Sequence, residues 1–535
     1  MRSAVAAFLC AAGGLWGQSG AQLANFRSTV DGTEQPYALY VPHEVDEAKR
    51  YPLLVSLHSE DTNHRINLRQ VFGLPIRSGE TNPEDLRQFP ARDPGMFVVA
   101  PFARGALDYR GIAEQDVYDV VAEMERRFPI DPDRVYLTGI SMGGAAAIRL
   151  ALTHPDAWAA VAAVCPSTVW GAADLAPNAL DVPIRLYHGD HDPVAPVAVS
   201  RDWQRRLVDA GVAAEYVEYP GLRHNAWELA YRDAGVFTWL SQFHRNRAPE
   251  HVRVAARSYS EGAAYWVRID GLTPGLLASV DARRSGGEIV VATTNVDGFT
   301  LTPEGRPSAI TIDGAAFKPR PGTALSFNKS AGKWRAGLFA SAGKHRGAEG
   351  PIVEAVNGRH LYVYGSGGAS TDQELAKRRA VAEAAASWTS SRSRLGLSFG
   401  VKVDTAVTPD DLATADLVLF GTVETNALIA RFAPQLPLAL NAGAADYGLL
   451  YIAPAGTHYA LVSSGLPWWT GADIANRGGP PFAPEQYRLL ATFGDYVLFK
   501  GSLANVVEEG RFDTNWKVPP DAAARMLATG TVTLH

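Results

Sequence analysis

The chain has 535 residues, of which 47% are hydrophobic and 20% charged, a composition typical of a globular protein with several domains. These values exclude a disordered, collagen-like or coiled-coil chain. Lysine and arginine number 50 against 56 aspartates and glutamates, so the formal charge is −6 and no basic surplus points to nucleic acid or anionic lipid. The two cysteines, Cys10 and Cys165, are too few for a disulfide framework or a cysteine-based zinc site.

The first 21 residues are predicted to be a secretory signal peptide. Arg2 supplies a positive charge, and the apolar run over residues 4–15 is too short to span a membrane. Small residues at 19–21 suit a cleavage site before Gln22, although a retained buried helix is the alternative. No later stretch holds eighteen consecutive apolar residues without a charge, so we expect a secreted or periplasmic protein with no membrane span.

Residues 22–247 alternate between apolar strands and helical patterns. The predicted strands are 37–41, 53–57, 97–100, 135–137, 159–164, 184–187 and 216–219. The predicted helices are 116–128, 143–152, 197–209 and 227–243, and an Asp-Pro-Asp turn is expected at 131–133. Repeated strand–helix units indicate the α/β class, with a doubly wound, mostly parallel sheet and helices on both faces.

The pattern changes after a polar segment near residues 245–249. Residues 250–347 are turn-rich, with strands expected at 265–269 and 288–292, and predict a small β-rich domain. Residues 350–502 return to α/β character and predict a smaller, flavodoxin-like domain, with a strand at 360–364, a helix at 372–388 and a strand at 417–420. The segment 503–535 is expected to be a tail.

The glycine-rich stretch 365–368 follows one of these strands and is similar to a loop that cradles a nucleotide. It lacks both G-x-G-x-x-G and the lysine of a P-loop, so a turn without a ligand is the favoured interpretation.

A candidate nucleophile lies at Ser141, within Gly139-Ile140-Ser141-Met142-Gly143. A predicted strand precedes this G-x-S-x-G pattern and an alanine-rich helix follows it. In that context the glycines leave room for a sharp turn that exposes the hydroxyl. The backbone N–H of Met142 at the start of the helix is then a candidate oxyanion donor.

A serine nucleophile needs a base and a carboxylate that orients the base. His224 follows the strand at 216–219, so it lies where such a base is expected, after the serine in chain order. Two carboxylates follow the strand at 184–187, namely Asp190 and Asp192, and their position alone does not decide between them.

This region resembles the α/β-hydrolase serine esterases, especially the polyhydroxybutyrate depolymerase, feruloyl esterase and prolyl oligopeptidase-like group. The resemblance covers roughly residues 35–245. Its motifs are residues 133–144 around Ser141, then His188-Gly189-x-x-Asp192-x-Val194-x-Pro196, then His224 with Trp227. It implies an α/β-hydrolase fold, a Ser141–Asp192–His224 triad and no metal or organic cofactor. Asp190 and His191 are then expected to be solvated.

One segment departs from the family pattern. The family usually has His-Gly and another small residue after its third strand, whereas here His58 is followed by Ser59-Glu60-Asp61. A backbone N–H of Ser59 or Glu60 can still complete the oxyanion hole. The two carboxylates are expected to face solvent. The alternative is that they face the cleft, where they would weaken catalysis by like-charge repulsion or select cationic substrates. His58, His64 and Asp61 lack a well-spaced further ligand, so loop residues are favoured over a metal site.

The interpretation is a secreted serine hydrolase that cleaves carboxylic esters. Trp170 and Trp227 are candidate pocket residues, with core packing as the alternative, and no long lid insertion interrupts the region, which suits a bulky or polymeric ester. The alternatives are a prolyl oligopeptidase-like peptidase and a non-catalytic binding protein on a hydrolase fold. The sequence does not define the oligomeric state.

Overall fold

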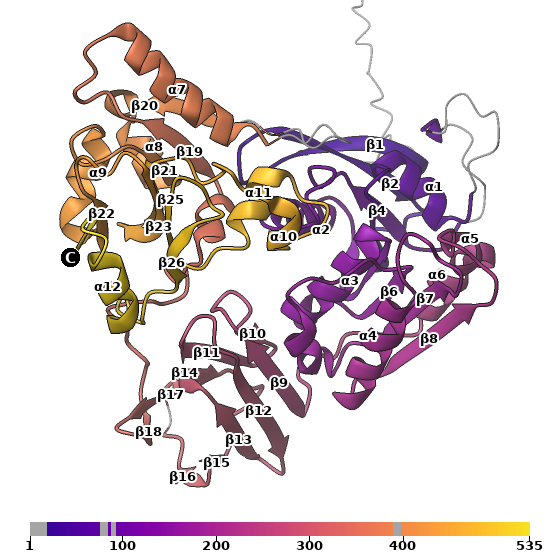
Figure 1. Ribbon diagram of the computed structural model, residues 1–535. Coiled ribbons are helices and arrows are strands. Elements are labelled where there is room, and N and C mark those ends of the chain that lie inside the picture. Colours follow the sequence, from indigo (N-terminus) through magenta and orange to yellow (C-terminus); the bar gives the residue numbers. More distant parts are fainter. Residues whose placement is uncertain (1–18, 75–83, 87–92, 321, 389–396, 398) are drawn as a thin grey trace, which may run out of the picture.

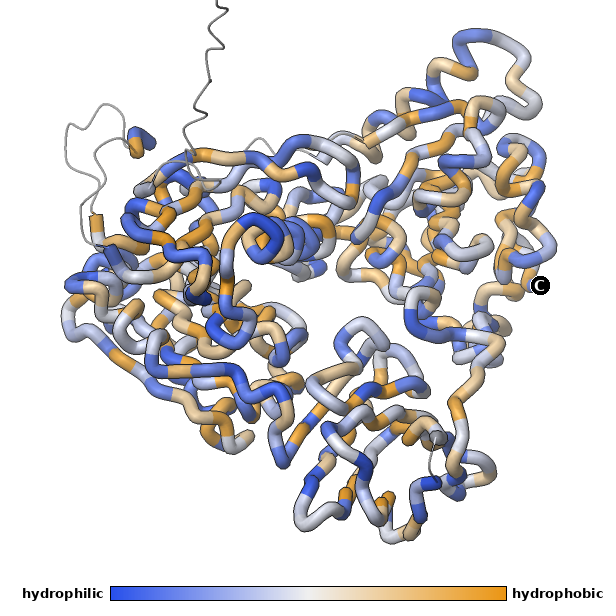
Figure 2. The backbone as a smooth tube through the Cα atoms, turned by 180° about the vertical axis from the view of Figure 1, so that it is seen from behind, coloured by the Kyte–Doolittle hydropathy of each residue, from blue (hydrophilic) through white to orange (hydrophobic). Residues whose placement is uncertain are grey.

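The computed structural model describes residues 19–74, 84–86, 93–320, 322–388, 397 and 399–535. Cys10 and nearly all of the expected signal peptide lie outside these residues. Three parts of the chain are arranged as the corners of a triangle (Figures 1 and 2). None of the helices in the described residues is long and apolar enough to cross a membrane.

The first part contains an eight-stranded sheet in the order β1-β2-β4-β3-β5-β6-β7-β8. Its strands are β1 (Gly20–Arg27), β2 (Glu34–Val41), β3 (Tyr51–Leu57), β4 (Phe97–Pro101), β5 (Ile130–Ile140), β6 (Ala160–Val164), β7 (Ile184–Gly189) and β8 (Ala214–Tyr219). From β4 to β8 all neighbours are parallel, while β1 and β2 are antiparallel. The fold class predicted for this region, a doubly wound, mostly parallel sheet, is confirmed.

Helices cover both faces of this sheet and bury one apolar cluster on each face. Their bounds are α1 (His64–Val71), α2 (Ile112–Arg127), α3 (Met142–Thr153), α4 (Ala198–Asp209), α5 (Trp227–Ala230) and α6 (Gly235–Leu240). Consecutive strand residues alternate between the clusters, since Leu53 and Val55 face α2–α4 whereas Leu54 faces α1, α5 and α6. The carboxyl ends of the parallel strands are therefore held at one rigid edge.

Two local predictions for this region are wrong. The helix expected over 227–243 is broken, because Asp233 and Ala234 adopt positive φ values of 53° and 58°. The Asp-Pro-Asp stretch at 131–133 lies inside β5 rather than in a turn. β1 begins at Gly20, so cleavage before Gln22 would remove its first two residues, which pair with β2; the signal peptide stays a prediction.

The second part consists of two five-stranded sheets that enclose their own apolar core. One sheet has the order β10-β11-β14-β17-β18 and the other β16-β15-β13-β12-β9. The strands are β9 (His251–Ala256), β10 (Ala263–Ala264), β11 (Val267–Leu272), β12 (Ala278–Ser285), β13 (Glu288–Thr294), β14 (Val296–Leu301), β15 (Ala309–Ile312), β16 (Ala315–Phe317), β17 (Leu325–Ser330) and β18 (Lys333–Ala336).

The third part is built on a seven-stranded sheet in the order β20-β19-β21-β24-β23-β25-β26. Its strands are β19 (His360–Tyr364), β20 (Gly400–Val403), β21 (Asp416–Phe420), β23 (Tyr447–Ala455), β24 (His458–Gly465), β25 (Tyr496–Lys500) and β26 (Val506–Gly510). The parallel half has the 2-1-3 strand order of flavodoxin-like folds, whereas β23, β25 and β26 run antiparallel to their neighbours.

The helices of the third part are α7 (Asp372–Ala386), α8 (Pro409–Thr414), α9 (Ala427–Phe432), α10 (Ile474–Arg477), α11 (Glu485–Leu490) and α12 (Pro520–Leu527). The expectation that residues 503–535 form a separate tail is wrong. β26 pairs with β25, and β27 (Val532–Leu534) pairs with β22 (Leu438–Leu440).

The glycine-rich turn at 365–368 is closely packed. A Cβ on Gly365 would lie 2.0 Å from the carbonyl oxygen of Thr425, and one on Gly367 would lie 2.6 Å from that of Glu424. These glycines therefore have a packing reason that needs no ligand.

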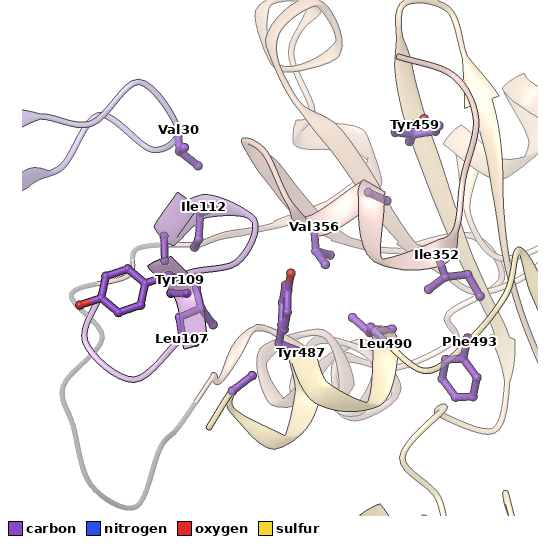
Figure 3. Close-up of a cluster of buried hydrophobic side chains, with 14 of the residues drawn as sticks. Val30, Leu107, Tyr109, Ile112, Ile352, Val356, Tyr459, Tyr487, Leu490 and Phe493 are labelled. Carbon is purple, nitrogen blue, oxygen red and sulfur yellow. The ribbon is translucent and has the colours of Figure 1, made fainter. Parts of the chain in front are cut away.

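The first and third parts share one apolar cluster (Figure 3). Ile112 and Leu107 lie on the side of the eight-stranded sheet, with Val356 and Tyr487 on the side of the third part. Gly111 has a φ of 52°, and a Cβ there would lie 2.4 Å from Oδ1 of Asn357, so a glycine permits this close approach. The two parts are joined by buried apolar surface as well as by the chain.

Candidate active site

Ser141 occupies a strained turn between β5 and α3. Its φ is 55°, a conformation that a non-glycine residue adopts only when its surroundings hold it. A Cβ on Gly139 would lie 2.1 Å from the carbonyl oxygen of Gly143, and one on Gly143 would lie 2.2 Å from that of Leu57. Both glycines of the G-x-S-x-G pattern are thus required by backbone contacts on either side of the serine.

Three side chains from separate strand ends meet at this turn. Nε2 of His224 lies 3.1 Å from Oγ of Ser141, and Nδ1 of His224 lies 2.7 Å from Oδ2 of Asp192. The carboxylate accepts a hydrogen bond from the Nδ1–H group, which leaves the Nε2 lone pair directed at the serine hydroxyl. This arrangement can transfer a proton from Ser141 to His224.

Asp192 is held by more than its bond to His224. Its side chain is fully buried, and Oδ1 accepts hydrogen bonds from the backbone N–H groups of Val194 and Ala195 at 2.8 and 2.9 Å. Burial alone would raise the pKa of this carboxyl group, but the hydrogen bonds from His224 and the two amides outweigh it and lower the pKa. Asp192 is therefore kept ionised.

His188 is a site residue whose role the sequence did not indicate. It is fully buried, and its Nε2 lies 3.2 Å from Oδ2 of Asp192 and 2.9 Å from the carbonyl oxygen of Ala195. Its Nδ1 lies 2.7 Å from Oγ of Ser200. Burial lowers the pKa of His188, so the ring is neutral, and the acceptors around Nε2 place the proton there. His188 thus donates toward the carboxylate of Asp192.

Asp190 faces another part of the loop. Its Oδ1 accepts hydrogen bonds from Nδ1 of His191 and from the backbone N–H of Gly221. The bond from His191 lowers the pKa of Asp190, and the carboxylate stays partly exposed. The structure therefore brings Asp192, rather than Asp190, to His224.

Close packing around Gly189 explains why a glycine follows His188 in this motif. A Cβ at Gly189 would lie 2.2 Å from the carbonyl oxygen of Leu222 and 2.5 Å from that of Arg223. These residues directly precede His224, so the absence of a side chain at Gly189 lets the loop that carries His224 reach β7.

The segment after β3 lies against the serine turn. A Cβ on Gly143 would also lie 2.7 Å from the carbonyl oxygen of His58, so the start of this segment packs against the residue that follows Met142. The Tyr109 hydroxyl accepts a hydrogen bond from the backbone N–H of His58 at 2.7 Å and so holds the start of the segment in place. Glu60 is partly buried, whereas Asp61 is exposed.

The two histidines near this segment have different surroundings, since His58 is hydrogen-bonded whereas the buried ring nitrogens of His64 make no hydrogen bond. Both ring nitrogens of His58 face backbone carbonyl oxygens, those of Ser59 at 2.7 Å and Phe102 at 3.0 Å. His64 packs edge-on against Phe102, and burial lowers its pKa to about 3. Both rings are neutral, and the ring of His58 has no nitrogen directed at a shared metal position.

Among the described residues, the potential metal ligands that gather in a group of three are Cys165, Asp192 and His224, whose ligand atoms lie within 4.8 Å of one another. Nδ1 of His224 is already bonded to Asp192. Burial raises the pKa of the Cys165 thiol, and a neutral thiol is a poor metal ligand. The geometry fits proton transfer better than metal binding.

The two tryptophans singled out from the sequence have different surroundings. Trp227 contacts His224 edge-on, with ring centroids 5.7 Å apart, so it lies beside the triad. Trp170 instead lines a cavity between the parts of the molecule, where the guanidinium of Arg110 lies 5.1 Å from the centre of its ring.

Comparison with known proteins gives the class of this region. Residues 113–240 match the family described as Phospholipase/Carboxylesterase. A 119-residue stretch is 34% identical to the putative esterase NocK of Nocardia uniformis subsp. tsuyamanensis and covers 22% of this chain and 28% of that protein. A 121-residue stretch is 32% identical to cutinase 1 of Thermobifida cellulosilytica and covers 22% of this chain and 44% of that protein.

A solved structure of a thermostable esterase is similar at 23% identity with a TM-score of 0.34, over 42% of this chain and 63% of that one. The chain spans less than half the length of the two curated relatives. The resemblance of the first part of the chain to the α/β-hydrolase serine esterases is confirmed: this part is similar to proteins of that group.

Proposed function

We propose that this protein is an exported serine esterase that works through a Ser141–His224–Asp192 triad and an acyl-enzyme. The observation that carries the proposal is the position of His224, whose two ring nitrogens lie 3.1 Å from the hydroxyl of Ser141 and 2.7 Å from the carboxylate of Asp192. The esterase and cutinase relatives support an ester as the substrate.

Each side chain has a defined task in this mechanism. Asp192 holds the proton on Nδ1, so Nε2 of His224 accepts the proton of Ser141 as the hydroxyl attacks the ester carbonyl. His224 then returns the proton to the leaving alcohol, and water completes the second half-reaction by the same route. No metal or organic cofactor enters these steps.

The oxyanion is proposed to be bound by the backbone N–H of Met142 and by one of Ser59 or Glu60. The first lies at the amino-terminal end of α3, where the unpaired N–H groups and the helix dipole favour negative charge. The second donor comes from the segment that packs against Gly143. Such donors stabilise the tetrahedral intermediate by about 3–4 kcal/mol each.

The substrate and location belong to the same proposal. Trp227, beside His224, is proposed to line the acyl or alcohol pocket, and a bulky or polymeric ester suits the region. Export follows from the expected signal peptide. Mass spectrometry of the protein recovered outside the cytoplasm should give an amino terminus near Gln22.

The test combines covalent labelling with a substrate panel. A fluorophosphonate probe should modify Ser141, and p-nitrophenyl, feruloyl, acetyl-xylan and hydroxybutyrate esters should identify the preferred acyl group. The Ser141→Ala variant should fold normally and lose about 10⁴-fold or more in kcat, since only the nucleophile is removed.

The alternatives give different results. Rapid cleavage of proline anilides with slow ester hydrolysis would indicate a peptidase of the prolyl oligopeptidase type. A protein that is folded but takes up no probe and hydrolyses no ester would be a binding protein on a hydrolase fold, and near-normal turnover by Ser141→Ala would exclude the triad.

A further inference from the structure

A cavity of about 680 Å³ lies where all three parts of the molecule meet. The first part contributes residues of α2, α3 and the segment after β6, the β-rich part contributes residues 257–261, and the third part contributes residues 351–358 and 487–494. The volume is within the range of small-molecule sites, which occur preferentially at domain interfaces. None of the proposed triad residues lines this cavity.

The charged groups of the cavity wall are balanced. Arg149 lies 2.9 Å from Glu114, Arg257 pairs with Asp174, and both of the lining residues Arg110 and Arg511 have a carboxylate within 4 Å. The lining carboxylates are Glu114, Glu261 and Glu354. Burial raises the pKa of Glu354 to about 8 and also raises that of Glu261, so burial disfavours a charge on both groups. The remaining charges are those of Glu114 and of the four arginines, and each arginine has a carboxylate neighbour, so the wall favours an uncharged ligand.

The cavity wall carries some groups that can only donate hydrogen bonds and others that can only accept them. Guanidinium groups only donate and an ionised carboxylate only accepts, whereas a protonated carboxyl group, which the raised pKa of Glu354 favours at neutral pH, does both. A hydroxyl group does both, so a ligand rich in hydroxyl groups can bridge an arginine and a glutamate with one atom. A ketone can only accept hydrogen bonds, and an amide needs two different atoms to do what one hydroxyl oxygen does.

Three buried donors in the wall make no hydrogen bond, and one of them, Nε of Arg110, lies 3.5 Å from a carboxylate oxygen of Asp108. The other two are Nε of Arg149, a residue only 7% exposed, and the hydroxyl of Tyr118. A buried donor left unpaired costs about 1–3 kcal/mol, and both belong to residues that line the cavity. A ligand that supplies acceptors would remove this cost.

Aromatic rings complete the lining. Trp170, half-buried, is fixed by the guanidinium of Arg110 near its ring and by a hydrogen bond from that side chain to its carbonyl oxygen. The Tyr118 ring is stacked on His154, whose pKa is lowered by burial, so this pair is neutral. Such flat apolar surfaces beside hydrogen-bonding groups suit the C–H faces of sugar rings.

We infer that this cavity is a second binding site, separate from the triad, which takes a neutral oligosaccharide. The site holds the polysaccharide or glycoside to which an ester group is attached, or a free oligosaccharide of the same kind. The inference stands on the cavity alone and does not require that Ser141 be a nucleophile.

The test is isothermal titration of the full-length Ser141→Ala protein with neutral xylo-, cello-, manno- and malto-hexaose, none of which contains an ester. Hexagalacturonate and a chitosan hexamer serve as anionic and cationic probes. At least one neutral hexaose should bind with a Kd at or below about 1 mM, and neither charged hexamer should bind more tightly than it.

Variants locate the binding. Trp170→Ala should weaken the Kd about tenfold or more, and Tyr118→Phe, which removes a hydroxyl without breaking a protein hydrogen bond, should weaken it several-fold. Trp469→Ala is the matched control, since this half-buried tryptophan of the third part does not line the cavity. Circular dichroism checks that each variant is folded.

Three results would overturn the inference. These are the absence of binding for all neutral hexaoses, preferential binding of a charged hexamer, and neutral binding that Trp170→Ala and Tyr118→Phe leave unchanged. Binding by Ser141→Ala together with inactivity of the wild-type protein on esters would support this site while contradicting the proposed esterase activity.

Discussion

Asp190 and Asp192 stand two positions apart in one loop, and their contacts predict opposite effects of the same substitution. Asp192→Asn should lower kcat by about 10⁴-fold, because the amide cannot hold the reactive tautomer of His224. Asp190→Asn should lower kcat only a few-fold, since its carboxylate binds His191 and Gly221. Steady-state ester hydrolysis by both variants is the measurement, and a larger loss for Asp190→Asn would reverse the assignment.

His188 is expected to act as a positioning residue through Asp192. Its Nε2–H is directed at Oδ2 of Asp192, so His188→Ala removes a donor, raises the pKa of Asp192 and lowers kcat by about tenfold or more with little change in KM. The low-pH limb of the kcat profile should move to higher pH. His188→Gln can place an amide N–H near the same position and should recover part of the loss.

A purely structural role for His188 would give another pattern. Its loss would then lower the melting temperature and the amount of active protein, while the pH profile of the remaining activity would match that of the wild type. Equal kcat values and profiles for His188→Ala and the wild type would contradict the positioning role.

At this scale the sequence predicted the residues whose spacing is tied to a motif. Ser141, His224 and the choice of Asp192 followed from strand ends and from family resemblance. The contribution of His188 depends on Ser200 and Ala195, which reach it only after α4 has packed against β7. No pattern in the chain signals such a contact.

At the scale of an element, the end of β7 is shaped by a glycine that makes room for a neighbouring loop. Gly189→Ala should lower kcat by about 100-fold, because a Cβ there would lie 2.2 Å from the carbonyl of Leu222 and would displace the loop of His224. Gly358→Ala is the matched control, since the nearest atom to its Cβ would be 3.9 Å away. Kinetics with the same ester compare the two variants.

The result that would contradict this account is a Gly189→Ala enzyme with wild-type kcat. Proteolysis at residues 220–224 gives an independent readout, since a displaced loop should be cut faster in Gly189→Ala than in Gly358→Ala.

Strands could be predicted from the sequence where their side chains are buried along the whole strand. The central strands are apolar runs covered on both faces, and such runs are visible in the sequence. The failures have local causes. The 227–243 helix is interrupted by two non-glycine residues in the left-handed region, and β26 is a half-buried edge strand with the polar sequence VVEEG, which no alternation distinguishes from a loop.

At the scale of the whole molecule, Glu349 joins the β-rich part to the third part and makes stability depend on pH. Its carboxylate is 3% exposed and accepts hydrogen bonds from the backbone N–H groups of Tyr259 and Ser260. Burial raises its pKa from an ordinary value of 4.5 to about 7. The folded protein therefore binds this proton more tightly than the unfolded chain does.

The direction in which stability changes with pH follows from these two pKa values. Below about pH 4.5 both states are protonated, and between about 4.5 and 7 the unfolded chain alone releases the proton, so the free energy of unfolding falls as pH rises, by about 3 kcal/mol in total. Glu349→Gln should remove this slope, and the exposed Glu288→Gln should keep it. Urea midpoints at half-unit pH steps provide the measurement, and equal slopes for Glu349→Gln and the wild type would contradict the pKa shift.

The apolar cluster shared by the first and third parts has a consequence for how the protein is made. Leu107 and Ile112 are synthesised early, but Tyr487 and Phe493, which belong to the same cluster, come more than 300 residues later. At about 5–20 residues per second, the completed first part waits roughly 12–50 s for the side chains that cover this surface. During that interval a nascent chain exposes a hydrophobic patch to which a chaperone can bind, and a ribosome stalled after residue 247 would hold the domain in its most aggregation-prone form.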